Sequence, residues 1–447
     1  MSGASAWQLA PLWTDYLLWL LVLAVALTIA YVRRQPHLRA PWRQVGRSGT
    51  GMVAALVLMA YVGIGLLDSV HLTSDRGAVV SVLDLCLSDL RDRTETTYSA
   101  PLATHSASLE SMTDKDGNTV RAAPRLRYGG AHLGAPAQQR NADLRDRALL
   151  GIAKAVALWL AIAVVMLIWR RRLGSDGFPM RRVLGTLLVM ALMIGVLREW
   201  ADGYHVFGTD KVGQDVLYLS LKSVRTGLMI GLLTTLVMLP LAMVLGIAAG
   251  YFRGWVDDLI QYLYTTLSSI PSVLLIAAAV LMMQVTMSNH PEWFDSLESR
   301  ADLRLLFLCV ILGVTSWTGL CRLLRAETLK LREADYVEAA RAAGVGPLRI
   351  LSRHIAPNVM HIVLIQVTLD FSALVLAEAV LSYVGVGVDP STPSWGNMIN
   401  AARLELAREP VVWWSLSAAF AFMFTLVLAA NLFADQVREA FDPRRRA

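Results

Sequence analysis

The chain has few charged residues and few cysteines for its size. Only 17% of its 447 residues are Asp, Glu, Lys or Arg, whereas a typical soluble protein has about 25%. The three cysteines, Cys86, Cys309 and Cys321, form no CxxC pair and no Cys/His metal spacing. We therefore expect neither a disulfide within the chain nor a metal site.

Several catalytic motifs are also missing. The phosphate-loop pattern Gly-x4-Gly-Lys-Ser/Thr occurs nowhere, and the polar segments contain no HExxH or Gly-x-Ser-x-Gly motif. These absences argue against an ATPase and against the alternative of a polytopic membrane enzyme. We expect no catalytic residues in this chain.

Long apolar blocks take the place of charge. The chain is 55% hydrophobic, with a mean hydropathy of +0.49. A helix needs about 20 apolar residues to cross a hydrocarbon core roughly 30 Å thick. The sequence therefore predicts an all-α, multi-pass membrane protein surrounded by lipid. Its nine predicted spans are 14–32, 50–68, 149–169, 183–199, 226–251, 259–284, 304–321, 356–384 and 411–434.

Basic residues gather in short segments beside these blocks. The net charge is +6, but its placement is typical of cytoplasmic loops rather than of nucleic-acid binding, which we do not expect. With the N-terminus outside, the basic segments fall on the inside. These inside segments are 33–48, 170–182, 252–258, 322–355 and 435–447.

A polar stretch at 69–148 separates the second block from the third. It is rich in Ser, Thr, Pro and Gly and has little periodicity apart from Val79–Leu85. We expect a small extracytoplasmic insertion that is partly disordered, with Asp116-Gly117-Asn118 inside it. No internal repeat is evident, which weakens the alternative of a stand-alone secondary transporter or channel.

The inside segment after the seventh block has an unusual pattern. Its composition predicts a helix from Glu327 through Ala343. Gly344 and Gly346 would end that helix in left-handed geometry, and Pro347 would open the next one. The small side chains of this surface helix would let a partner dock closely, although a surface helix without a partner fits the composition equally well.

The order of residues in this segment resembles the "EAA" loop of ABC importer permeases. Tyr336 precedes Glu338-Ala339-Ala340, Gly344 follows, and Pro357 comes thirteen positions later. The family often has Leu before that proline, where this chain has Ala356. The resemblance implies that 336–354 is a coupling helix seated in a cleft of a separate ATPase.

More of the chain resembles the C-type subunit of the oligopeptide/dipeptide/nickel permeases. An outer segment carries His205, Phe207-Gly208-Thr209-Asp210, Gly213 and Asp215. Further matches, in order, are Gly254-Trp255-Val256-Asp257, Ile270-Pro271, Trp317, Arg322, Arg325, Glu378, Leu381-Ser382, Gly385, Gly387, Ser394-Trp395-Gly396, Asn431, Asp435, Arg438 and Asp442-Pro443-Arg444.

Four positions depart from the branch. Gln214 and Leu219 stand where Arg is usual, and Ser223 and Gly227 differ from the common Gly and Ser. These departures imply a different partner surface or substrate at the outer segment.

The resemblance also implies an organisation and a set of partners. Typical members have six spans, so 183–447 would be the permease domain and 1–182 an N-terminal extension with about three spans. The complete machine would add a second permease subunit, cytoplasmic ATPase subunits that use the ATP, and an extracytoplasmic substrate-binding protein. This chain would bind no cofactor and would move peptides across a bacterial inner membrane, with nickel or another small solute as the alternative.

Ionisable residues in the eighth block and the outer histidines are further candidates. Counted from Pro357, Asp370 lies about 20 Å along a helix and Glu378 about 31 Å. We favour a packing role for Glu378 and leave Asp370 between packing and the solute pathway. His105, His132, His205 and His290 are scattered without ligand spacing, so we expect loop histidines rather than a nickel site.

Overall fold

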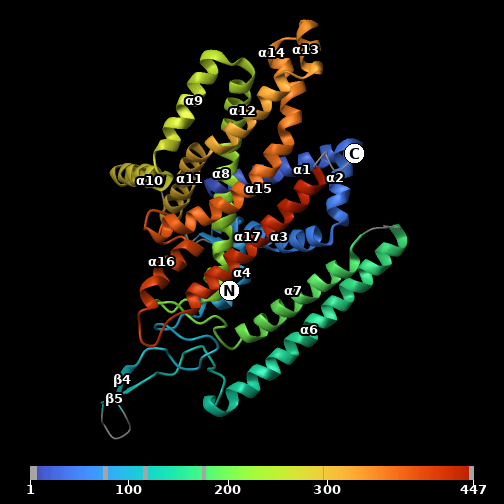
Figure 1. The fold of residues 1–447 in the computed structure, drawn as a ribbon. Helices are drawn as coiled ribbons and strands as arrows, with labels where there is room; N and C mark the ends of the chain where they lie inside the picture. Colours follow the sequence, from blue (N-terminus) through green and yellow to red (C-terminus); the bar gives the residue numbers. More distant parts are fainter. Residues whose placement is uncertain (1–7, 74–78, 114–118, 174–177, 295, 442–447) are drawn as a thin grey trace. The chain divides into compact units, whose positions relative to one another are not determined.

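The computed structural model describes residues 8–73, 79–113, 119–173, 178–294 and 296–441. Among these residues, nine helical stretches are long and apolar enough to cross a membrane, as Figure 1 illustrates. This confirms the predicted all-α polytopic class and the nine spans. The stretches are Trp13–Arg34, Gly49–Asp68, Gln138–Ile168, Met180–Ala201, Val216–Phe252, Ser272–Asn289, Leu297–Arg332, Pro347–Tyr383 and Trp414–Phe441.

Helices of three kinds make up the described chain. Those that supply the spans are α1 (Trp13–Arg34), α3 (Gly49–Asp68), α6 (Pro136–Leu173), α7 (Met180–Ala201), α8 (Val216–Phe252), α10 (Ser272–Asn289), α11 (Leu297–Ser316), α12 (Thr318–Arg332), α15 (Ala356–Tyr383) and α17 (Trp414–Phe441). Shorter helices are α2 (Pro36–Arg47), α4 (Val82–Cys86), α5 (Ser88–Asp92), α9 (Gly254–Ser269), α13 (Asp335–Ala342), α14 (Pro347–Ile350) and α16 (Trp395–Glu405). A 3-10 turn spans Pro291–Trp293 and a π-helical turn spans Leu351–Ile355.

The sixth predicted span has the wrong bounds. Instead of one helix over 259–284, the chain forms α9 and then α10, with an extended residue, Ile270, between them. Pro271 causes this break, because proline lacks a backbone N–H and disfavours helical geometry in the residue before it. Only α10 is long and apolar enough to span.

The insertion at 69–148 forms short strands and helices over its described residues, although its sequence has little periodicity. Strands β1 (Gln8–Leu9), β2 (His71–Thr73) and β3 (Val79–Ser81) form an antiparallel sheet, with Leu72 opposite Val80. Strands β4 (Glu110–Thr113) and β5 (Thr119–Ala122) form a hairpin. The helix that contains the third predicted span, α6, begins at Pro136, ahead of the apolar block at 149–169. Asp116-Gly117-Asn118 lie outside the described residues.

One compact unit comprises Met1–Ala10, Gly46–Thr226 and Pro393–Ala429. In it, α6 and α7 lie side by side (Figure 1). Small residues permit their contact: a Cβ added at Gly151 would lie 2.6 Å from the Gly195 carbonyl oxygen. Trp159 of α6 also donates from Nε1 to the Leu184 carbonyl at 2.8 Å. The two helices therefore form a closely packed hairpin.

The second unit comprises Pro11–Val45, Gly227–Thr392 and Ala430–Ala447. Its core buries Met238 of α8, Leu324 of α12 and Val359 of α15. The backbone N–H of Thr14 in α1 donates to Asp302 Oδ2 of α11 at 3.0 Å. Residues of the predicted extension therefore occur in each unit, and the division at residue 182 stays a prediction from sequence.

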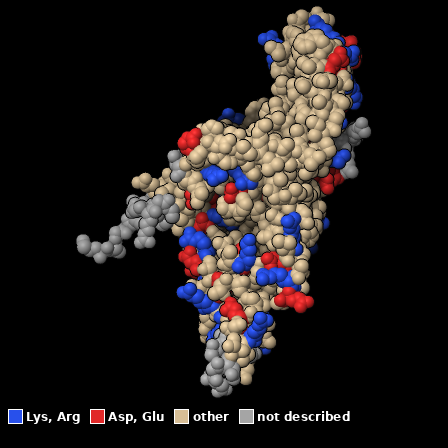
Figure 2. Space-filling model, turned by 90° about the vertical axis from the view of Figure 1, so that its left-hand side faces the viewer, with Lys and Arg blue, Asp and Glu red and all other residues tan. Residues whose placement is uncertain are grey.

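Apolar side chains cover much of the outside of the spans. Leu23, Val165, Met282 and Phe420 are each more than half exposed. Figure 2 shows a broad area without charged side chains on the visible face. Such surface is a liability in water but is the expected lipid-facing surface of membrane helices.

The close α6–α7 contact predicts that a larger side chain at Gly151 destabilises the chain. Gly151→Val should destabilise the chain by about 1–3 kcal/mol, because the new side chain would overlap the backbone of α7. The check is the thermal unfolding midpoint in detergent. Gly185→Val in α7 is the matched control, since a Cβ there meets nothing within 4 Å. Equal midpoints for the two variants would contradict the close packing.

Candidate coupling loop and outer segment

The inside loop joins α12 to α15 through two short helices. Figure 1 shows α13 and α14 at the tip between those two long helices. The single helix predicted for Glu327 through Ala343 is wrong, because α12 ends at Arg332 and α13 starts at Asp335. Ala334 between them is extended. Asp335 and Glu338 favour a new start here, since acidic side chains stabilise the positive end of a helix.

Gly344 ends α13 as predicted. Its φ is +76°, and the N–H groups of Gly344 and Val345 donate to the carbonyls of Arg341 and Ala340. This pair of bonds is the Schellman arrangement, which needs a left-handed residue. Gly346 differs from the prediction: its φ is −64° and it precedes Pro347 at the start of α14. Only Gly344 therefore requires glycine for its backbone.

One side of the loop is fixed in the core and the other side is open. Val337, Ile350 and Ile355 are at most 1% exposed and belong to the cluster that contains Leu324. The open side includes six exposed residues and a half-buried alanine, Ala340. The exposed residues are Tyr336, Glu338, Ala339, Gly344, Leu348 and Pro357.

Polar contacts also hold the base of this loop. Arg325 donates from Nε and Nη2 to the two carboxylate oxygens of Asp257 in α9, at 2.5 and 2.7 Å. These hydrogen bonds outweigh the effect of burial and lower the pKa of Asp257. The Asn358 amide also donates to the Tyr336 hydroxyl at 3.1 Å. The loop is therefore attached to its helices by directional as well as apolar contacts.

The outer segment between α7 and α8 is covered by the insertion. The Leu102 N–H donates to the His205 carbonyl at 2.9 Å, and the Thr209 N–H donates to the Ser99 carbonyl at 3.1 Å. A Cβ at Gly208 would lie 2.3 Å from the Ser99 carbonyl oxygen. The backbones of the two segments therefore touch directly, which the sequence analysis missed.

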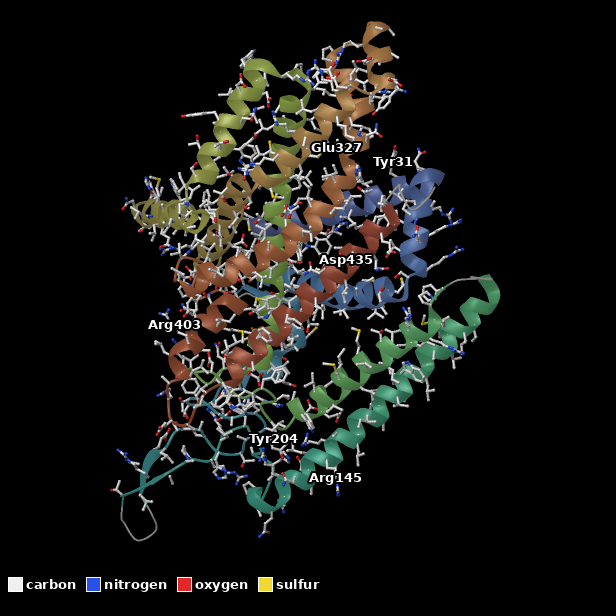
Figure 3. The ribbon with its side chains drawn as sticks, in the orientation of Figure 1. Tyr31, Arg145, Tyr204, Glu327, Arg403 and Asp435 are labelled. Atoms are coloured by element: carbon white, nitrogen blue, oxygen red, sulfur yellow. The ribbon has the colours of Figure 1, made fainter. Side chains whose placement is uncertain are left out.

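The remaining predicted residues of this segment have local roles. The Phe207 ring lies 6.4 Å from the Phe422 ring in an edge-on arrangement. Asp210 accepts from the backbone N–H groups of Val212 and Gln214 at 2.9 and 2.8 Å. Tyr204, labelled in Figure 3, donates from its hydroxyl to Asp143 of α6 at 2.9 Å. These contacts fix the segment between the ends of two spans.

His205 is the centre of a buried charged cluster. Its Nδ1 lies 2.8 Å from Asp215 Oδ2 and its Nε2 lies 3.2 Å from Glu95 Oε1. Burial opposes protonation of the ring, but the hydrogen bonds to Asp215 and Glu95 outweigh it and raise the pKa of His205 to about 9. An imidazolium has no lone pair for a metal, so the structure makes His205 a structural cation in its loop.

Glu95 connects this cluster to the rest of the insertion. Its carboxylate accepts from the backbone N–H groups of Arg127, Tyr128 and Gly129 at 2.8–3.1 Å. Burial opposes its ionisation, but the bonds from His205 and these N–H groups lower the pKa of Glu95 to about 2. Within the described chain, no group of three His, Cys, Asp or Glu side chains is placed to hold a metal.

A second charged cluster joins α8 to the insertion and α3. Lys222 Nζ lies 2.7 Å from Asp68 Oδ1 and 2.7 Å from Asp84 Oδ1. Tyr218 also donates to Asp84 at 2.8 Å. The sequence analysis missed this cluster, whose signal is a lone acidic residue and a lone lysine beside two apolar blocks.

The two carboxylates of α15 have different surroundings. Asp370 is half-buried and accepts from the Gln366 amide at 2.8 Å. Glu378 is 2% exposed and accepts from the Ser382 hydroxyl at 2.7 Å. Its burial supports the packing role hypothesised for Glu378, whereas Asp370 has a side open to a partner or solute.

The His205 cluster makes stability depend on pH. Because its pKa rises from 6.5 to about 9, protonated His205 stabilises the fold fully below pH 6.5, and this stabilisation is lost as pH rises through about 9. We expect His205→Gln to be less stable than the natural chain at pH 6, by up to about 3 kcal/mol. The difference should shrink toward pH 10.

Unfolding midpoints at pH 6, 8 and 10 measure this dependence. His105→Gln is the control, because it removes an exposed histidine of the same insertion. Its unfolding midpoint should depend on pH as steeply as that of the natural chain. The same slope in His205→Gln as in the natural chain would show that the cluster is not protonated as described.

Comparisons with known proteins show which family the chain is similar to. Residues 242–447 match the family described as "Binding-protein-dependent transport system inner membrane component". The glutathione transport system permease protein GsiD of Pectobacterium atrosepticum is 31% identical over 56% of this chain and 76% of that protein. The di/tripeptide permease protein DppC of Pseudomonas aeruginosa is 32% identical, over 55% and 75%.

A third relative is the oligopeptide permease protein OppC of Mycobacterium bovis, which is 30% identical over 54% of this chain and 77% of that protein. These relatives confirm the resemblance inferred from the EAA loop. The chain therefore belongs to the inner membrane components of binding-protein-dependent transport systems, in the peptide branch of the ABC importer permeases.

Proposed function

We propose that this chain is the permease subunit of an ATP-driven importer that moves peptides or similar small solutes across the inner membrane by alternating access. Family membership supports the transport role, and the names of the relatives favour peptides or glutathione over nickel. The observation that carries the mechanism is the inside loop, which is anchored on one side and open on the other. A channel acting alone would not need such a loop.

The loop is the mechanical input in this proposal. A separate ATPase chain binds and hydrolyses ATP, and its cleft holds the open side of α13 and α14. The exposed side chains of Ala339 and Ala342 are small enough for close approach, and Leu348 is 79% exposed. Movement of the cleft then reaches α12 and α15 through Val337, Ile350 and Ile355, because packed interfaces move as discrete bodies.

On the outer side, the proposal assigns docking of the extracytoplasmic binding protein to the insertion together with the outer segment. His205, Thr209 and Asp215 are buried by the insertion, so they are not available to a partner. Lys211 and Gln214 stay exposed beside them. The binding protein would therefore meet a surface made largely by the insertion. A second permease subunit would pair with this one, and the open side of Asp370 is a candidate for that contact or for the solute pathway.

Gly344→Val should uncouple transport while the subunit still inserts and assembles. A β-branched residue at φ +76° is strained, so the end of α13 should shift relative to the ATPase cleft that holds it. We expect transport-linked ATPase activity of the reconstituted importer to fall at least about tenfold, since about 1.4 kcal/mol suffices for that factor.

Gly346→Val is the matched control. Gly346 is also exposed, but its φ is −64° and a Cβ there meets nothing within 4 Å, so this variant should keep its activity. Unchanged transport-linked ATPase activity in Gly344→Val would refute the assignment of the coupling loop.

Leu348→Asp should weaken binding of the ATPase. Burial of a leucine side chain contributes about 1.5–3 kcal/mol, so the dissociation constant should rise about tenfold or more. Co-purification of the ATPase with the tagged permease measures this. Leu297→Asp is the control, because Leu297 is 78% exposed and begins α11 rather than the coupling loop. Equal recovery of ATPase with both variants would exclude Leu348 from the contact.

A further inference from the structure

A cavity of about 500 Å³ lies where α2 ends and where α3 and α7 begin. Its volume is within the range of sites that bind small molecules. Three of its lining residues are arginines and three are apolar: Arg47, Arg181, Arg182, Phe178, Pro179 and Met180. The cavity is separate from the coupling loop and from the outer segment, and it belongs to the part of the chain that precedes the family match.

The arginines of this cavity have no acidic partner among the described residues, which exclude 174–177. Among the residues that the structure describes, no carboxylate forms an ion pair with Arg47, Arg181 or Arg182. Arg182 lies across the first residue of α3, because a Cβ at Gly49 would be 2.2 Å from its Cδ and 2.3 Å from its Nη1. Several guanidinium groups that line one cavity favour a shared anion.

Two helix ends add to the same potential. α3 and α7 have 20 and 22 residues, and neither has an acidic residue in its first turn. Pro179, at the N-cap of α7, has no side-chain acceptor for the first N–H groups, whereas Ser48 caps α3 by accepting from the Gly51 N–H at 3.2 Å. A helix N-terminus behaves as roughly half a positive charge, so arginines placed there are unfavourable unless an anion is present. The arginines and the helix ends therefore repel one another in the absence of a ligand.

The cavity faces the cytoplasmic side of the membrane. Four spans separate it from the coupling loop: Met180–Ala201, Val216–Phe252, Ser272–Asn289 and Leu297–Arg332. An even number of crossings places the cavity and the coupling loop on the same side. This step alone rests on the proposed function, which puts that loop inside the cell. The cavity then lies at headgroup level, where α3 and α7 enter the hydrocarbon.

We propose that this cavity binds the phosphate of an anionic phospholipid from the cytoplasmic leaflet. The arginines hold the phosphate in bidentate hydrogen bonds, and Phe178 and Met180 contact the glycerol and the first methylenes. Apolar residues continue along both helices, with Met59 58% and Val189 57% exposed, which suits acyl chains better than a free anion. None of the described residues that line the cavity is a carboxylate that could bind an ammonium headgroup, so a zwitterionic lipid fits less well.

Native mass spectrometry of the full chain in nanodiscs tests the proposal. Phosphatidylglycerol should bind more tightly than phosphatidylcholine, and Arg181→Gln/Arg182→Gln should raise the dissociation constant for phosphatidylglycerol about tenfold or more. Arg33→Gln/Arg34→Gln at the end of α1 is the control. It removes the same charge outside the cavity and should keep the affinity.

Three results would overturn the proposal. The first is equal affinity for the two lipids in the natural chain, which needs no variant and holds even if the arginine variant fails to insert. The second is unchanged phosphatidylglycerol affinity in a folded Arg181→Gln/Arg182→Gln chain. The third is that inorganic phosphate stabilises the chain in phosphatidylcholine nanodiscs as much as phosphatidylglycerol does. That result would assign the cavity to a soluble anion. No arm needs ATP or a partner chain, so failure of the importer proposal would not produce these results.

Discussion

The hydrocarbon of the bilayer cannot hydrogen-bond a peptide group, and this constraint shapes every functional part of the chain. The backbone inside the membrane must be helical, so irregular geometry is confined to the ends of the spans. The left-handed Gly344 and the covered segment around Gly208 both occur where the chain has left a span. The candidate contacts with soluble partners therefore lie in the connections outside the spans, while the helices between them transmit movement.

Charges buried near the span ends must be paired, because an isolated buried charge costs several kcal/mol. The His205 and Lys222 clusters satisfy this requirement with carboxylates from the insertion, Glu95 and Asp84, in addition to Asp215 and Asp68. Such clusters fix the position of the insertion in addition to stabilising the fold. The insertion is held against the start of α8 by two sets of charges. Gln214 and Leu219, which depart from the family pattern, lie between His205 and Lys222 in the sequence.

Local signals in the sequence were enough for the spans and for the end of α13. Apolar length predicted nine spans, and the Gly344 and Pro347 pattern predicted a helix end followed by a new start. The break at Pro271 could have been predicted from the proline, but the apolar residues on both sides led to the prediction of a single span. The His205 cluster was not readable, because Glu95 lies 110 positions away and nothing in its neighbourhood marks it as a partner. Pairings over such distances depend on the tertiary fold, and periodicity carries no information about them.

The residues that precede the family match are built into the structure at several points. α1 bonds to α11 through Thr14 and Asp302, and Trp42 of α2 packs edge-on against Phe441 of α17. In the other unit, Tyr61 of α3 donates to the Phe422 carbonyl of α17. Each contact lies within one unit and joins an early helix to a later one. Helices held in this way are attached to later helices of their own unit, so their contacts extend beyond the insertion that follows α3.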